Sequence, residues 1–288
     1  MTARFAYKRV VVGIDHCAPD RETVRAAAEL AGLMRLDLMG LFIADPGLLG
    51  LAGRPGAREF QVLAKRWQPL SAEGLSRDIE LSALSARRAI DAAARASGVR
   101  ARFETVQAAV REAIRAASQS SDIVIVAEPH NPVDRAIAPF PQLVRAAVES
   151  AATVLFLPRR LVRSRGPVLA IATSAADPGI AVAAAIASAA GEGLVVIEAF
   201  ERTTAEAGEG PDPASEAGVS VGRLTVARSA LADIRALSSA LGGVGERMIV
   251  VTRGAFGEAD GAHPADLASL CGVPVLMVEP AGDSDTAP

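Results

Sequence analysis

The chain has 288 residues, half of them hydrophobic, and a formal net charge of −3 at pH 7. This length predicts two domains of ordinary size, and the hydrophobic content excludes a disordered chain. The acidic balance and an aromatic content of 3% argue against nucleic acids and membranes as partners, because both favour basic or aromatic surfaces.

The two cysteines, Cys17 and Cys271, lie far apart in the sequence. Two thiols in a chain of this length give no disulfide framework and are typical of a reducing compartment. The N-terminal residues run directly into an apolar strand without a signal-peptide pattern. We therefore expect a soluble, cytoplasmic protein.

Apolar strands and helices alternate along the first part of the chain. We predict strands over 9–15, 38–44, 102–106, 123–126 and 154–157, and a helix over 22–34 that Asp20 caps. The stretch 46–98 is a long insertion with a Gly/Pro-rich loop and one or two helices. Within it, Phe60, Leu63, Trp67 and Leu70 follow helical spacing and predict a helix packed on the sheet or on the other half, an alternative being a partner-binding face.

The second part of the chain repeats this series. Strands are predicted over 167–172, 194–200, 219–226, 248–251 and 275–278, with a helix over 179–190 that Asp177 caps. The polar stretch 203–217 predicts a mobile loop. Arginine-rich residues 159–166 predict a solvated linker, an alternative being an anion site.

The repeat predicts an α/β chain of two tandem flavodoxin- or Rossmann-like domains. Continuous apolar strands alternating with helices are typical of parallel sheets covered on both faces. We expect five parallel strands in the order 3-2-1-4-5 in each domain. The predicted domains span 1–160 and 167–280, joined by a linker at 161–166 and followed by a disordered tail at 281–288.

The strand series resembles the tandem, two-domain form of the universal stress protein family. The carriers are "VVVGIDHC", "LMGLFIAD", "DIVIVAE", "ATVLFLP" and "GVPVLMVEP", in that order and spacing. Nucleotide-binding members of this family have a loop G-x2-G-x9-G-S/T after the fourth strand, in which backbone N–H groups surround phosphates. The resemblance implies that Asp15 and Ile43 would line such a pocket in the first half.

The loop residues of both halves depart from that pattern. In the first half Glu128, Asn131 and Pro141 stand at the glycine positions and Gln142 at the Ser/Thr position. A carboxylate and a residue without an N–H group both disfavour phosphate binding. The second half keeps Gly254 and Gly257 but lacks the later Gly-Ser. ATP is therefore a disfavoured cofactor, and we expect none.

Ligand-type side chains follow the first and fourth strands of the first half. Asp15 ends the first strand, His16 and Cys17 follow it, and Glu128 and His130 follow the fourth strand. These strands are neighbours in the expected order, so the five residues could line one crevice. A polar ligand pocket, a transition-metal site or ordinary crevice-edge residues all remain open, and no close-spaced metal motif supports a metal.

No nucleophile elbow, phosphate loop or zinc motif occurs in the sequence. We therefore expect a stress-response or regulatory protein, not an enzyme, that binds a protein client or a small ligand. Its halves are expected to associate as an internal pseudo-dimer, with a homodimer as a further option. The alternatives are a nucleotide-binding protein with a non-standard site and a metal-dependent enzyme at the crevice.

Overall fold

The computed structural model describes residues 7–14, 20–61, 64–129, 140–150, 152–200, 218–257 and 264–280, without the side chain of Gln142. The chain forms two compact units. The first unit comprises residues 9–118, and the second comprises residues 1–8 and 119–288.

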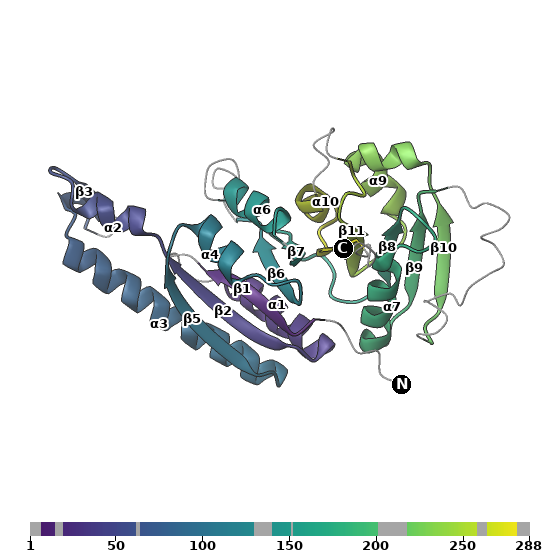
Figure 1. Ribbon diagram of the computed structural model, residues 1–288, viewed down its shortest axis with the longest axis horizontal. Coiled ribbons are helices and arrows are strands. Elements are labelled where there is room, and N and C mark those ends of the chain that lie inside the picture. Colours follow the sequence, from purple (N-terminus) through teal and green to yellow (C-terminus); the bar gives the residue numbers. More distant parts are fainter. Residues whose placement is uncertain are drawn as a thin grey trace, which may run out of the picture. The chain divides into compact units, whose positions relative to one another are not determined.

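The first unit contains a parallel sheet in the order β1-β2-β5 (Figure 1). Its elements are β1 (Arg9–Ile14), α1 (Arg21–Met34), β2 (Asp37–Ala44), α3 (Ala72–Ser97), β5 (Ala101–Gln107) and α4 (Val110–Ala117). Helix α1 contacts β1 and β2, and α3 contacts β2, β5 and α1. The strands β1 and β2 are buried at most positions, as expected for parallel strands covered by helices.

The insertion between β2 and α3 does not form the predicted helix around Phe60 and Trp67. It forms α2 (Pro46–Ala52) and an antiparallel hairpin of β3 (Arg58–Gln61) and β4 (Arg66–Pro69). Phe60 lies opposite Trp67, with ring centroids 5.3 Å apart. The seven-residue spacing therefore reflects a cross-strand pair and not two turns of a helix. The helical prediction for this segment is wrong.

The second unit contains strands from both halves of the sequence, which are the two predicted domains 1–160 and 167–280. They are β6 (Asp122–Ala127), β7 (Thr153–Leu157), β8 (Val168–Ala172), β9 (Leu194–Glu198), β10 (Val221–Thr225), β11 (Met248–Thr252) and β12 (Val275–Val278). Their order is β10-β9-β8-β11-β12-β7-β6. Within the second half, β8 to β12 pair in parallel in the predicted order 3-2-1-4-5.

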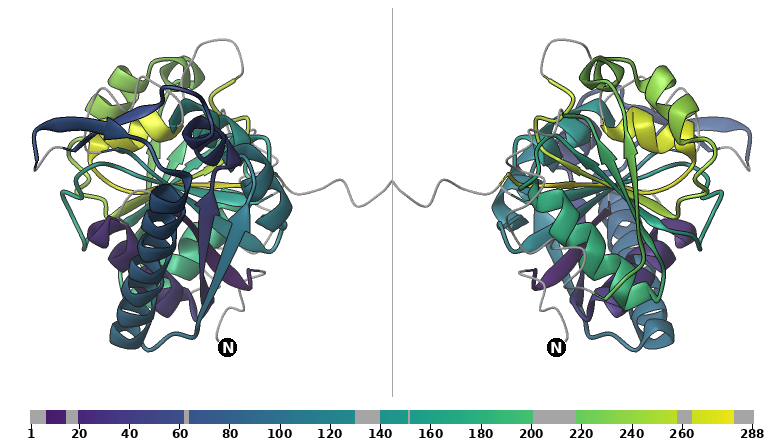
Figure 2. Two further views of the ribbon diagram at one scale, coloured as in Figure 1. Left: turned by 90° about the vertical axis from the view of Figure 1, so that its left-hand side faces the viewer. Right: turned by 90° about the vertical axis from the view of Figure 1, so that its right-hand side faces the viewer.

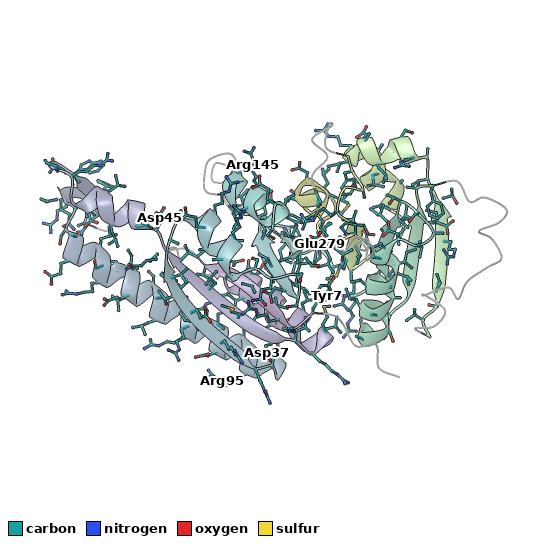
Figure 3. The ribbon with its side chains drawn as sticks, viewed as in Figure 1. Tyr7, Asp37, Asp45, Arg95, Arg145 and Glu279 are labelled. Atoms are coloured by element: carbon teal, nitrogen blue, oxygen red, sulfur yellow. The ribbon has the colours of Figure 1, made fainter. Side chains whose placement is uncertain are left out.

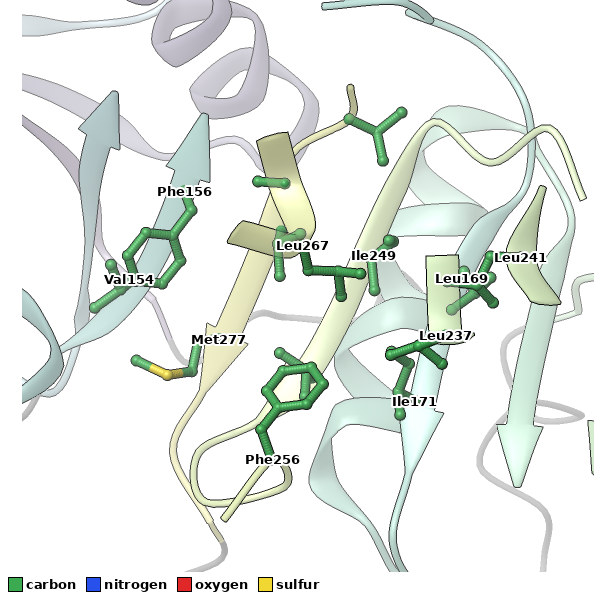
Figure 4. Packing of buried hydrophobic residues seen from close by; sticks show 14 of the residues in the cluster. Val154, Phe156, Leu169, Ile171, Leu237, Leu241, Ile249, Phe256, Leu267 and Met277 are labelled. Atoms are coloured by element: carbon green, nitrogen blue, oxygen red, sulfur yellow. The ribbon is translucent and has the colours of Figure 1, made fainter. Parts of the chain in front are cut away.

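The two halves meet at their last strands. Strands β7 and β12 are antiparallel, with Leu155 opposite Leu276 and Phe156 opposite Val275. Side chains from both halves share one buried cluster, which includes Phe156 of the first half and Leu267, Ile249 and Met277 of the second (Figure 4). Because this core is continuous across the β7–β12 pair, the second unit is stabilised by both halves together.

Helices cover the strands of the second unit. They are α6 (Phe140–Val148), α7 (Pro178–Ala190), the 3-10 helix η1 (Arg228–Ala232), α9 (Ile234–Leu241) and α10 (Pro264–Cys271). Helix α7 contacts β8, β9 and β11, whereas α10 contacts β12, β7 and α9.

The two predicted aspartate caps are confirmed. Asp20 accepts hydrogen bonds from the N–H groups of Glu22 and Thr23 at the start of α1. Asp177 accepts one from the N–H of Gly179 at the start of α7. Each carboxylate therefore occupies the positive end of its helix.

The predicted loop 203–217 and the tail 281–288 lie outside the described residues. Within the described linker residues, the N–H of Val162 donates to the carbonyl of Gly272 at 2.8 Å. The domain boundaries near 160 and 167 stay a prediction.

Candidate functional site

In the second half, the carboxylate of Asp177 joins the C-terminal ends of β8 and β11. Its Oδ2 accepts from the N–H and the hydroxyl of Thr173, at 2.9 and 3.2 Å. Its Oδ1 accepts from the N–H of Gly179 at 2.9 Å and from the hydroxyl of Thr252. The residue is only 5% exposed. Four donors from three elements thus hold one buried carboxylate.

This carboxylate lies where the fold would receive an anion. Ligands of open parallel sheets bind outside the carboxyl ends of the strands, at the point where the strand order reverses. In the second half that point lies between β8 and β11. A phosphate there would use the N–H groups at the start of α7, one of which already donates to Asp177. The carboxylate of Asp177 therefore lies in this crevice at the start of α7, on the helix that follows the first strand of this half.

The loop after β11 contains the predicted residues Gly254 and Gly257. Both are left-handed, with φ of 84° and 73°. The N–H of Gly257 donates to the carbonyl of Gly254 at 3.1 Å, and that of Ala255 donates to Thr252 at 3.1 Å. The two glycines therefore satisfy tight turns, and these N–H groups are engaged within the loop.

Arg253, in the same loop, connects the second half to the first. Its guanidinium donates to the carbonyls of Val148 and Ala152, the latter at 2.9 Å. It also binds the carboxylate of Glu279, labelled in Figure 3, through Nε at 2.8 Å. The carbonyl of Val148 is at the end of α6, where a cation complements the helix dipole.

Glu128 borders a cavity of about 410 Å³ in the second unit. Its Oε2 accepts from the N–H of Arg159 at 3.2 Å, and its Oε1 from the hydroxyl of Ser269 at 3.3 Å. The remaining lining comes from the residues after β6 and β7, the linker and the end of α10: Pro129, Pro158, Arg160, Val162, Leu270, Cys271 and Gly272. The cavity thus combines one carboxylate, two guanidinium-bearing residues and an apolar wall.

Cys271 contributes a thiol to this cavity. Burial raises the pKa of the thiol, with a smaller opposing effect from its hydrogen bond to Ser238. Glu246 also raises this pKa, and Arg163 lowers it. The thiol is therefore kept in its protonated, less nucleophilic form at neutral pH.

Similar folds were found among solved structures. No protein-family model matches the sequence, and no curated protein is similar to it. A universal stress protein from Archaeoglobus fulgidus DSM 4304 superposes with a TM-score of 0.67 at 13% identity, covering 97% of this chain and 100% of that one. A universal stress protein described from Pseudomonas aeruginosa UCBPP-PA14 has a TM-score of 0.50 at 17% identity, covering 96% and 94%. Another P. aeruginosa protein, of unknown function, has the same score and identity.

The chain has the universal stress protein fold. The resemblance drawn from the strand series is thereby confirmed at the level of the flavodoxin-like α/β architecture. Identities of 13% to 17% carry the fold alone, so ligand and activity rest on this chain's own residues.

The site residues predicted for the first half fall partly outside the described part of the chain. Asp15, His16, Cys17, His130 and Asn131 lie outside the described residues. Two others are described. Ile43 is a buried residue of β2, 2% exposed, and Glu128 lies at the cavity. Pro141 is the second residue of α6.

The described part of the chain holds no group of three or more His, Cys, Asp or Glu residues that could bind a metal. Across the same residues, no helix is both long enough and apolar enough to cross a membrane.

The sequence reasoning missed Arg253 and the cavity beside Glu128. Arg253 directly follows an apolar strand at the position that Glu128 holds in the first half. The loop pattern had paired Glu128 with Gly254, one residue later, and therefore did not reveal this acid–base exchange. The cavity had no sequence signal, because its residues come from three separated segments of the chain.

Proposed function

We propose that this protein is a stress-response or regulatory protein that works by binding and does not bind ATP. The observation that carries the proposal is the buried carboxylate of Asp177 at the start of α7. A nucleotide phosphate bound in the crevice between β8 and β11 would lie near this anion, and like charges in a buried site repel strongly.

The first half supports the same proposal through its residue types. Glu128 places a carboxylate at the end of β6, and it already accepts hydrogen bonds from Arg159 and Ser269. Pro141 has no N–H group to offer to a phosphate. Each lost charge-assisted hydrogen bond weakens binding by about 1.5–3 kcal/mol, so a few losses remove micromolar affinity.

We propose that a protein client or a small polar ligand takes the place of the nucleotide. The cavity beside Glu128 is large enough for a small molecule and offers both charge signs and apolar walls. A binding role requires neither a catalytic base nor a cofactor. The cytoplasm is the proposed compartment, and the proposal includes neither nucleic acid nor membrane as a partner.

Two other functions stay open to experiment. One is nucleotide binding at a non-standard site, for which Gly254 and Gly257 are the best candidates. The other is a metal-dependent reaction that uses His16, Cys17 and His130 after the first and fourth strands. For neither function does the described part of the chain bring together a group of residues that favours it over the binding role.

Calorimetric titration with Mg-ATP and with AMP tests the proposal. We expect no binding at physiological salt, and a dissociation constant below about 10 μM (near −7 kcal/mol) would contradict it. If binding occurs, the variant Gly257→Asp assigns it, because lost affinity would place the site in the second half. A matched Gly218→Asp variant, also at a left-handed glycine, controls for backbone strain.

Native mass spectrometry of protein from its own host would show a resident ligand directly. Elemental analysis tests the metal-dependent function. We expect less than about 0.1 equivalent of metal per chain, and a stoichiometric amount of metal would favour that function.

A further inference from the structure

The cavity beside Glu128 has a counterpart in the second half, and there an arginine side chain occupies it. Glu128 and Arg253 correspond, because the N–H of each donates to the last residue of the final strand of its half. Val148 at the end of α6 and Ser269 near the end of α10 also correspond, because each lies nine residues before the end of that strand. Glu128 contacts Ser269, and Arg253 contacts Val148. The two side chains therefore enter equivalent spaces.

The partners of Arg253 correspond to residues of the cavity wall. Its guanidinium donates to the carbonyl of Val148 and binds the carboxylate of Glu279. The equivalent residues are Ser269 and Pro158, which directly follows β7 as Glu279 follows β12, and both line the cavity. One space is therefore filled by a guanidinium of the chain itself, whereas the shorter side chain at the other leaves a cavity of about 410 Å³.

The end of α10 makes this cavity favourable for a cation. Helix α10, in yellow in Figure 2, packs on β7 of the first half and on β12 of the second, and its last three residues line the cavity. The carbonyls of the last turn of a helix lack partners within the helix and carry partial negative charge. The last turn of α10 has no basic residue, whereas that of α6 has Arg145. Glu128 adds a carboxylate to the same cavity.

The linker supplies positive charge at this cavity. Arg159 and Arg160 line it, and both residues are exposed. Arg163, further along the linker, is close enough to Cys271 to lower the pKa of the thiol. A ligand with cationic groups alone would meet these guanidinium groups, whereas a ligand that also has a carboxylate would pair with one of them.

Apolar side chains from the linker and α10 complete the cavity. Val162 and Leu270 both line it and are 63% and 51% exposed. The N–H of Val162 donates to the carbonyl of Gly272 at 2.8 Å, and a Cβ on Gly272 would collide with the Val162 side chain. The linker is therefore packed closely on the end of α10. The two apolar side chains suit the methylene groups of a ligand whose charged groups lie at its ends.

We propose that the cavity binds a small guanidino acid, with a guanidinium at one end and a carboxylate at the other. The guanidinium binds Glu128 and the end of α10, as Arg253 binds Glu279 and the end of α6 in the second half. The carboxylate pairs with Arg160, and the methylene groups contact Val162 and Leu270.

This inference rests on the proposed binding function and names the ligand class of its cavity. The two can fail separately. Absence of both ATP and guanidino-acid binding would overturn the ligand class alone, whereas ATP binding would contradict the proposed function and leave the cavity test valid.

NMR titration of the full chain with 4-guanidinobutanoate tests the proposal. The matched probe is 4-ureidobutanoate, in which a neutral group of the same shape replaces the guanidinium. We expect the amide signals of Cys271 and Gly272 to shift, and the ureido compound to bind with a dissociation constant at least about tenfold higher. Equal affinity of the two compounds would overturn the proposal, as would unchanged signals at about 10 mM 4-guanidinobutanoate.

Glu128→Gln tests the cationic end of the ligand. It removes the negative charge at nearly constant size and should raise the dissociation constant of 4-guanidinobutanoate about tenfold. The control Glu29→Gln makes the same change at an exposed position of α1 and should bind like the unaltered chain. Unchanged affinity in Glu128→Gln would overturn the proposal. The comparison of the two probes on the unaltered chain does not depend on how this variant folds.

Arg160→Ala tests the anionic end of the ligand. Because Arg160 is exposed, the variant is compatible with folding, which the melting temperature checks. It should weaken 4-guanidinobutanoate by about threefold or more and should not weaken propylguanidinium, which lacks the carboxylate. An equal loss of affinity for both compounds would overturn the pairing of the carboxylate with Arg160.

Discussion

Glu128 and Arg253 hold equivalent positions in the two halves of the second unit. Each follows the fourth strand of its half, and each backbone N–H donates to the last residue of that half's final strand, Leu157 or Val278. The side chain of each reaches a helix of the other half, Glu128 to Ser269 in α10 and Arg253 to Val148 at the end of α6. One half thus presents an acid, and the other a base, at equivalent places.

We expect Arg253→Ala to lower the free energy of unfolding by about 2–4 kcal/mol. The substitution leaves two backbone carbonyls and the carboxylate of Glu279 without this donor in a region where Arg253 is only 19% exposed. Arg253→Lys should recover only part of the loss, because an ammonium cannot reproduce the forked geometry. Chemical denaturation measures the effect.

The exposed pair of Arg77 and Glu73 provides the control. Arg77→Ala should change stability by less than about 0.5 kcal/mol, because both side chains are solvated. Equal effects of the two alanine variants would show that Arg253 does not hold the halves together.

Asp177→Ala should destabilise the second unit more than Asp233→Ala does. Both residues cap helices, α7 and α9, and the loss of a cap costs about 1 kcal/mol. Asp177 also accepts from Thr173 and Thr252 in a buried position, so its removal leaves further donors unsatisfied. We expect a total near 2–4 kcal/mol. Thermal melts of the two variants provide the measurement. Equal losses of stability in Asp177→Ala and Asp233→Ala would refute the prediction.

Gly40→Ala tests the packing of α3 on the first unit's sheet. A Cβ at this position would lie 2.8 Å from the ring of Phe103 and 2.9 Å from Ile90 Cγ1. We expect a loss of about 1–3 kcal/mol from overpacking, which should be smaller in a Phe103→Ala background, because that change removes the ring. Gly50→Ala in α2 meets no atom within 4 Å and should be neutral or slightly stabilising. Denaturation midpoints of these variants provide the measurement.

Alkylation of Cys271 should be slow at pH 8. Its rate should begin to rise only at a higher pH than the alkylation rate of an exposed thiol does. Burial raises its pKa, so the thiolate is scarce until the pH exceeds the ordinary range for cysteine. Because the pKa of Cys271 is higher in the folded than in the unfolded state, folding favours the protonated thiol. The contribution of this thiol to the stability of the folded protein is fully present below the unfolded-state pKa and is lost as the pH rises through the folded-state pKa. Iodoacetamide labelling in a Cys17→Ser background isolates this thiol. A rate equal to that of the denatured chain would contradict the prediction.

The sequence alone determined the strand series and the two aspartate caps, and it predicts the duplication. Apolar runs such as β6 and β11 are long enough to identify buried strands, and Asp20 and Asp177 immediately precede apolar helices. These signals are local, so neighbouring residues suffice to read them.

Only the tertiary structure decided what occupies the second-half crevice and how the insertion folds. Asp177 meets Thr252 across 75 residues, and no local pattern encodes that contact. The spacing of Phe60 and Trp67 is compatible both with a helix and with a cross-strand pair. In the structure, Phe60 lies opposite Trp67 in a hairpin, and their rings contact each other. Local periodicity cannot choose between these arrangements, because the choice depends on pairing partners that the chain brings together only when it folds.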